Sequence, residues 1–126
     1  MLLIPLVTVT VREVRGLKIK QKWIRMILSG EKPMEVRSIR YDLLGQRIAL
    51  GNSDNGFVEG YATVKDVITF PYSEIQKYED KHRATEWLRK HYRGRNILYG
   101  FILTEIEREK NPFTYTKSNS ICFRLK

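Results

Sequence analysis

Apolar and polar residues alternate with a period of two along most of this chain, which predicts a protein built mainly of β-strands. The alternating or β-branched stretches fall at residues 7–11, 17–20, 34–37, 46–50, 57–70, 97–103 and 121–125. Gly60 interrupts one of them and predicts a bent or bulged strand. Residues 97–103 are apolar on both faces, which predicts a strand in the middle of a sheet. A polar loop is expected at 111–119, before the last strand.

The hydrophobic period lengthens in two places and there predicts helices. In residues 21–29 the apolar side chains form a helical stripe opposite Lys22 and Arg25, and Gly30 suits the C-cap. Residues 72–91 have a helical composition, with a break expected near Arg83. Strands dominate and no regular βαβ alternation is present. We therefore expect an α+β fold, a small, partly closed mixed β-barrel with flanking helices, in a single domain spanning 1–126.

A cluster of Lys, Glu and Arg follows the first predicted helix. In an extended strand Glu35 and Arg37 share one face, while Met34 and Val36 point the other way into a core. Lys32 precedes the bend at a proline and lies close enough in sequence to reach back toward the polar face. Two interpretations stay open: a compact charged cluster between helix and strand, or a solvated strand edge.

The charge balance points to a polyanionic partner. The 126 residues contain 23 Lys and Arg against 14 Asp and Glu, a net charge of +9 with a pI near 9.8. RNA and DNA are the commonest partners of such proteins, and acidic lipid surfaces are a more distant option. The alternative is a basic protein without a polyanionic partner.

Composition also argues against several classes of protein. A lone cysteine, Cys122, forms no internal disulfide, and we expect a buried structural thiol there. His82 and His91 belong to no metal-ligand pattern, so no metal or other cofactor is predicted. The apolar N-terminus is too short to span a bilayer and lacks signal-peptide features. These points predict a cytoplasmic protein without a membrane partner.

The order of elements around the charged cluster resembles a known family. The pattern Gly-x-Lys-x-x-Glu-x-Arg across Gly30, Lys32, Glu35 and Arg37 lies between a helix and a short strand, as in the ASCH domain of the PUA-like β-barrel superfamily. The resemblance covers about residues 17 to 126. Residues 1–16 lie outside the core pattern and are expected to add a strand.

The resemblance implies two classes of function. ASCH domains are implicated in binding RNA or nucleotides, and some small bacterial members deacetylate N4-acetylcytidine, while others are reported as ribonucleases. If this chain is an enzyme, Lys32 and Glu35 are the catalytic candidates. Glu35 stands where the amidohydrolases place a threonine proposed as nucleophile, and a carboxylate is a poor equivalent for attack on an acetamide. It could instead activate water or hold Lys32 and Arg37 in place.

Further residues are candidates for nucleic-acid contacts. Arg37 offers a planar fork for phosphate or a base edge. The other candidates near the cluster are Trp23, Arg25, Ser38 and Arg40; for Trp23 core packing is the competing interpretation, and for Arg40 a plain surface charge. Glu79 and Asp80 could supply a second acid or be solvated helix positions. A stretch of basic residues interleaved with aromatics is typical of a nucleic-acid surface, and also of an amphipathic helix: Lys81, Arg83, Trp87, Arg89, Lys90, Tyr92, Arg93 and Arg95.

The leading hypothesis from the sequence is a nucleic-acid-binding domain, with RNA or another single-stranded nucleic acid as partner and Lys32, Glu35 and Arg37 lining a cleft. The alternative is an enzyme acting on a modified nucleoside, through amide hydrolysis, or a ribonuclease. A protein-interaction module is a third, non-catalytic interpretation.

Overall fold

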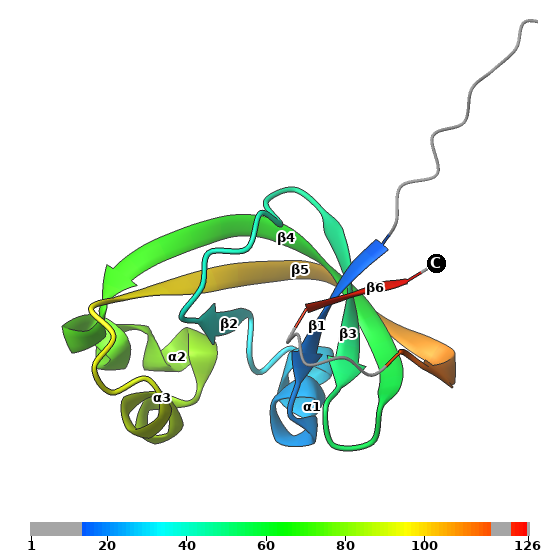
Figure 1. Ribbon diagram of the computed structural model, residues 1–126, viewed down its shortest axis with the longest axis horizontal. Helices are drawn as coiled ribbons and strands as arrows, with labels where there is room; N and C mark the ends of the chain where they lie inside the picture. The colour runs from blue at the N-terminus through cyan, green and yellow to red at the C-terminus, as the bar shows by residue number, and fades with distance from the viewer. Residues whose placement is uncertain (1–13, 117–121, 126) are drawn as a thin grey trace, which may run out of the picture.

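A curled, mixed β-sheet forms the body of the protein (Figure 1). The computed structural model describes residues 14–116 and the backbone of residues 122–125. Within these residues the strands are β1 (Val14–Ile19), β2 (Met34–Arg37), β3 (Arg47–Asn52), β4 (Phe57–Pro71), β5 (Ile97–Thr114) and β6 (Cys122–Leu125). They form one sheet in the order β2-β5-β4-β3-β1-β6. β1 runs parallel to β3, and every other pair is antiparallel. Because β2 and β6 are its two edges, hydrogen bonds between strands do not close the sheet.

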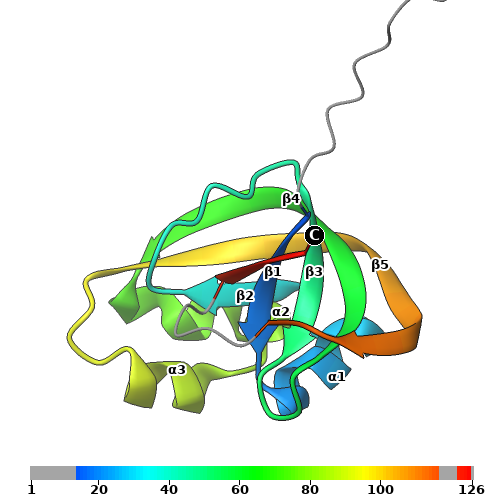
Figure 2. The same ribbon diagram turned by 45° about the vertical axis from the view of Figure 1, so that its right-hand side comes forward.

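The helices lie together below the two long strands β4 and β5, which run side by side across the molecule (Figure 1, Figure 2). They are α1 (Gln21–Ser29), a 3-10 helix η1 (Tyr72–Tyr78), α2 (Glu79–His82) and α3 (Thr85–His91). Gly30 ends α1 with a φ of 87°, a left-handed cap that glycine adopts at little cost. Arg83 separates α2 from α3 and also has a left-handed conformation, with a φ of 59°.

The α+β class and the mixed sheet with flanking helices are confirmed, as are helix 21–29, the break at Arg83 and the bulges of β4. The strand predicted at 97–103 is too short, because β5 continues to Thr114. Its last residues pair with the start of β4, so the loop expected from 111 begins later. The strand expected at residues 7–11 and the side chain of Cys122 lie outside the described part of the chain.

The core fills the space between the sheet and the helices. Leu17 and Ile19 of β1 point inward, as the alternation predicts, and meet Ile24 and Ile27 of α1. Met34 and Val36 are buried as well. The other face of β2 is also covered, so all four of its residues are buried. An edge strand that is buried on both faces must place its charged side chains in a protein environment, and this is what creates the site.

Gly60 allows a close approach between β4, β5 and α1. A Cβ atom there would lie 2.5 Å from the carbonyl oxygen of Glu107 and 2.7 Å from Cδ2 of Leu28. Because backbone of a paired strand cannot move aside, Gly60→Ala is expected to lower the free energy of unfolding by about 3 kcal/mol or more. At Gly100 the obstacle is the Met34 side chain, so Gly100→Ala is expected to cost less, about 1–3 kcal/mol. Urea unfolding of both variants checks this order, and equal losses would contradict it.

Candidate functional site

A buried Lys–Glu–Arg cluster joins the end of α1 to β2. The Nε and Nη2 atoms of Arg37 donate to Oε2 of Glu35 at 3.0 and 2.8 Å. Lys32 Nζ lies 3.5 Å from the other carboxylate oxygen, Oε1. The three side chains therefore share one carboxylate, as the period-two pattern of β2 predicts. The solvated strand edge, the competing interpretation of the sequence, is wrong, because Lys32 is 2% exposed and Glu35 and Arg37 are each 6% exposed.

The Lys32 ammonium group is held from three sides. It donates to the backbone carbonyl of His82 in α2 and faces Glu35. It also lies 5.1 Å from the centroid of the Trp23 ring, within range of a cation–π contact. Burial lowers the pKa of Lys32, and the neighbouring Glu35 carboxylate opposes that shift. A lysine with a lowered pKa beside a carboxylate is a frequent property of functional sites.

Arg37 also spans the opening in the sheet. Its Nη2 atom donates to the carbonyl oxygen of Lys18 in β1 at 2.8 Å. Within the described residues β6 pairs with β1 from Val14 to Leu17. A side chain of the edge strand β2 thus bonds the backbone of β1, the strand next to the opposite edge of the sheet. Within residues 14–116 the Nη1 atom of Arg37 makes no hydrogen bond, which leaves donors for a ligand.

The cluster lies in a pocket of about 440 Å³, here called the inner pocket. This volume is in the range of small-molecule sites. The remaining lining combines basic and hydroxyl side chains with aromatic and aliphatic ones: Lys18, Ile19, Lys20, Trp23, Val36, Ser38, Ser53, Ala84, Trp87, Leu88 and Tyr92. Burial raises the pKa of Tyr92, which keeps its hydroxyl protonated, and this hydroxyl points to the Val36 carbonyl at 3.5 Å. The pocket therefore offers cations, donors and flat apolar surfaces together.

The structure brings some of the predicted residues to this pocket and leaves others outside. Trp23 and Ser38 line it beside the cluster, and Trp23 is also a core residue, so both interpretations of it hold. Arg25 and Arg40 are exposed and do not line the inner pocket. The Glu79 carboxylate accepts a hydrogen bond from the Thr85 backbone amide at 3.2 Å, outside the inner pocket. Asp80 is an exposed helix residue.

The sequence named Trp87 and Tyr92 as aromatics of a candidate nucleic-acid surface, and both line the inner pocket. It did not identify Ala84, at the N-cap of α3, Leu88 in α3, or the contribution of His82, and these residues lie 50 or more positions from Lys32. The helical stripe of that segment indicates that one face of the helix is buried. The local sequence does not indicate which part of the protein that face packs against. His82 contributes its backbone carbonyl, which any residue possesses. No residue-type pattern could therefore have identified it.

The His82 ring is fixed by two hydrogen bonds, which makes the fold sensitive to acid. Nε2 bonds the Ile75 carbonyl at 2.7 Å, and Nδ1 accepts from the Ala84 amide at 2.9 Å, so the neutral ring fits. Burial lowers the pKa of His82 below its ordinary value of 6.5. As pH falls from 6.5 toward this lowered value, the unfolded chain binds a proton that the folded chain does not. The free energy of unfolding should therefore fall, by at most about 1.4 kcal/mol per pH unit for one proton.

Urea unfolding between about pH 8 and about pH 5.5 measures this slope. His91 supplies the control, because it is exposed and His91→Gln should keep the acid dependence of the parent. A parent protein whose stability is flat over this range would contradict the assignment.

Within the described residues, no group of three or more His, Cys, Asp or Glu side chains is placed to hold a metal ion. No helix in the same part of the chain is long and apolar enough to cross a membrane.

A curled mixed sheet with a charged pocket between its edge strand and a helical layer defines an α+β class of domain. The chain belongs to the ASCH domain family, whose profile matches residues 17–115. An ASCH protein from Zymomonas mobilis has a similar crystal structure, with a TM-score of 0.77 at 17% identity over 89% of this chain and 87% of that chain. A serine-to-alanine variant of it gives a TM-score of 0.79 at 16% identity, over 91% of this chain and 89% of that one.

A tyrosine-to-phenylalanine variant of the same protein gives a TM-score of 0.77 at 17% identity, over 91% of both chains. At these identities the likeness establishes the fold. No curated protein matches the sequence.

Proposed function

We propose that this protein binds single-stranded RNA and takes one nucleotide into the inner pocket. The observation that supports this most directly is the composition of the pocket, where Lys32 and Arg37 are buried beside the flat rings of Trp23, Trp87 and Tyr92. Ammonium and guanidinium groups bind phosphate and the acceptors of base edges, while aromatic rings pack against bases. The net charge of +9 favours approach of a polyanion.

The position of the cations explains why a whole nucleotide suits the pocket better than a phosphate alone. A surface lysine or arginine can bind phosphate without being buried. Here Lys32 and Arg37 are buried in the pocket, whereas Lys18 is partly exposed and Lys20 is exposed. A base or sugar can therefore reach the buried donors while the attached phosphate stays among the outer lysines.

Filter binding of a short single-stranded RNA over a salt series tests this proposal. Lys32→Met and Arg37→Gln keep much of the side-chain volume, and each should weaken binding about 10–100-fold, since a charge-assisted hydrogen bond contributes about 1.5–3 kcal/mol. Lys65→Gln, on the exposed face of β4, serves as the control and should change affinity little. The logarithm of the affinity should fall linearly with the logarithm of salt concentration. Binding that is indifferent to salt, or unchanged in both pocket variants, would overturn the proposal.

A second candidate function is hydrolysis of an amide on a modified nucleoside such as N4-acetylcytidine. The observation that favours it is Lys32, whose lowered pKa and contact with Glu35 are typical of catalytic pairs. In this reaction Glu35 would draw a proton from water, the water oxygen would attack the acetyl carbon, and Lys32 would stabilise the developing oxyanion. As the oxyanion collapses, the bond between the acetyl carbon and N4 would break, and Glu35 would return its proton to N4 of the departing base. Cytidine and acetate would be the products. Incubation with N4-acetylcytidine decides the matter, because turnover no greater than that of Lys32→Met removes this function.

A further inference from the structure

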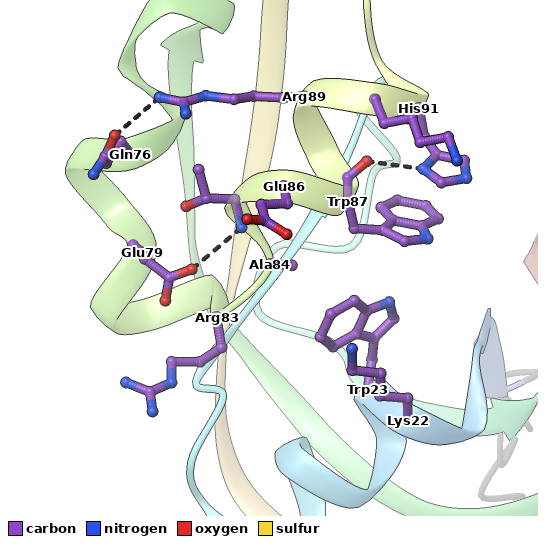
Figure 3. A pocket seen from close by; sticks show the side chains of 12 residues that line it. Lys22, Trp23, Gln76, Glu79, Arg83, Ala84, Glu86, Trp87, Arg89 and His91 are labelled. Carbon is purple, nitrogen blue, oxygen red and sulfur yellow. Dashed lines mark hydrogen bonds between the residues drawn. The ribbon is translucent and has the colours of Figure 1, made fainter.

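A second cavity, here called the outer groove, continues from the inner pocket (Figure 3). Its volume is about 670 Å³. Trp23, Ala84 and Trp87 line both cavities, so the two meet at these residues. The side chains beyond this junction come from α1, η1, α2, α3 and the break between α2 and α3. They include Lys22, Gln76, Glu79, Arg83, Glu86, Arg89, Lys90 and His91. The proposed function involves only the inner pocket and assigns no role to the outer groove.

The junction between the two cavities is aromatic. The indole rings of Trp23 and Trp87 meet edge to face, with centroids 6.3 Å apart and planes at 78°. The His91 ring stacks on Trp87 at 4.0 Å and 14° (Figure 3). Such flat surfaces suit nucleic-acid bases of any sequence. They lie where a strand leaving the inner pocket would enter the outer groove.

The outer groove is also positively charged beyond this junction. Lys22, Arg83, Arg89 and Lys90 line it, against the two carboxylates of Glu79 and Glu86. Arg89 is engaged by the Gln76 side chain at 3.0 Å. The side chains of Arg83 and Lys90 are exposed and make no hydrogen bond or ion pair with residues 14–116. Cations that the fold does not use are available to an anionic ligand.

The backbone at Arg83 gives an independent reason to assign it a binding role. Its φ of 59° and ψ of 26° are left-handed, a conformation that glycine or asparagine adopts at less cost. The break between α2 and α3 thus needs this backbone geometry but not an arginine. A strained residue at a cavity wall with an unused charge is a reasonable binding residue. In Figure 3 Arg83 lies on the side opposite the two indoles, and its side chain extends outward, away from them.

We propose that the outer groove holds the continuation of the RNA strand whose nucleotide occupies the inner pocket. The strand passes Trp23 and Trp87, and the phosphates of adjoining nucleotides lie against Arg83 or Lys90. The ligand is therefore an oligonucleotide of two or more nucleotides, and a free nucleoside fills only part of the site. This inference rests on the proposed function, because it takes the inner pocket as the place of the first nucleotide.

The dependence of affinity on RNA length separates this inference from the proposed function. The chain has two tryptophans, and both lie at the junction, so intrinsic fluorescence reports binding there. Oligouridylates of increasing length serve as probes, beginning with uridine 5′-monophosphate. Affinity should rise at least about tenfold from the mononucleotide to the tetranucleotide, which adds stacking and phosphate contacts. Equal affinity for both would overturn the inference and leave the proposed function standing, whereas no binding of either would overturn both.

Variants of the outer groove test the named residues. Arg83→Asn fits the left-handed backbone, so its melting temperature should not fall below that of the parent. Combined with Lys90→Gln, it should weaken tetranucleotide binding and reduce the salt slope by about 1–2, while mononucleotide affinity stays unchanged. Glu86→Gln removes a repelling charge and should strengthen tetranucleotide binding. Lys65→Gln, the control, should change neither tetranucleotide nor mononucleotide affinity. An Arg83→Asn/Lys90→Gln protein that binds the tetranucleotide as the parent does would overturn the inference.

Discussion

Replacing Glu35 with Gln is expected to lower the free energy of unfolding by about 3–5 kcal/mol, the largest stability loss that we predict for the site. The Glu35 carboxylate neutralises two buried cations, since it accepts both Arg37 hydrogen bonds and faces the Lys32 ammonium group. A neutral amide would leave the charges of Lys32 and Arg37 uncompensated in the protein interior. Urea unfolding at neutral pH measures the loss.

The exposed ion pair of Arg47 and Glu107 supplies a matched control. Arg47 Nη2 lies 3.2 Å from Glu107 Oε2, but the two side chains are 40% and 64% exposed. Glu107→Gln should therefore lower the free energy of unfolding by no more than about 1 kcal/mol. The Glu35→Gln protein should also gain stability with rising pH more steeply than the parent. Without the carboxylate the pKa of Lys32 falls further below 10.5, and deprotonation removes one buried charge. Similar losses in Glu35→Gln and Glu107→Gln would contradict this account of the cluster.

Removing all three charges together should change stability little but abolish RNA binding. The variant Lys32→Met/Glu35→Leu/Arg37→Met is expected to lie within about 2 kcal/mol of the parent in unfolding free energy, or above it, because a buried ion cluster replaced by apolar side chains is often no less stable. Met matches the unbranched stems of Lys32 and Arg37. The same variant should lose RNA binding, since it retains the volume of the inner pocket but none of its buried donors.

Unfolding and filter-binding measurements on one preparation check both parts of this prediction. A triple variant as unstable as Glu35→Gln would mean that the cluster holds the fold together by its net attraction. A triple variant that still binds RNA like the parent would mean that the buried cations serve the fold alone. The expected result is a variant that folds but does not bind RNA, and it would show that the cluster serves ligand binding.

Sequence patterns predicted those parts of the structure that depend on local geometry. The helical stripe of α1, its end at Gly30 and the alternation of β2 all follow from the pitch of a helix and the pleat of a strand. The convergence of Lys32, Glu35 and Arg37 follows too, because the three residues lie within six positions. Their burial does not follow, since it requires knowledge of what covers the outer face of β2.

The elements that sequence could not place are those defined by distant contacts. The second half of β5 has charged residues such as Glu105 and Glu107 and reads as polar chain, yet it pairs with β4 as a twisted ribbon. The α3 wall and the His82 carbonyl meet Lys32 only through tertiary packing. Arg25 and Arg40 are near the cluster in sequence, but neither lines the inner pocket. Nearness along a chain does not place a side chain in the same cavity.

The bond from Arg37 to the Lys18 carbonyl has a consequence for how this fold can change through evolution. Strand ladders fix register, so a substitution that disturbs one is propagated along the whole sheet. Here β2, one edge of the sheet, is joined to β1, the strand next to the other edge, by a guanidinium group, which imposes no register on either strand. The gap between β2 and β1 can accept new side chains while the ladders elsewhere stay intact. A lineage can therefore change the side chains along this gap and inherit the rest of the scaffold unaltered.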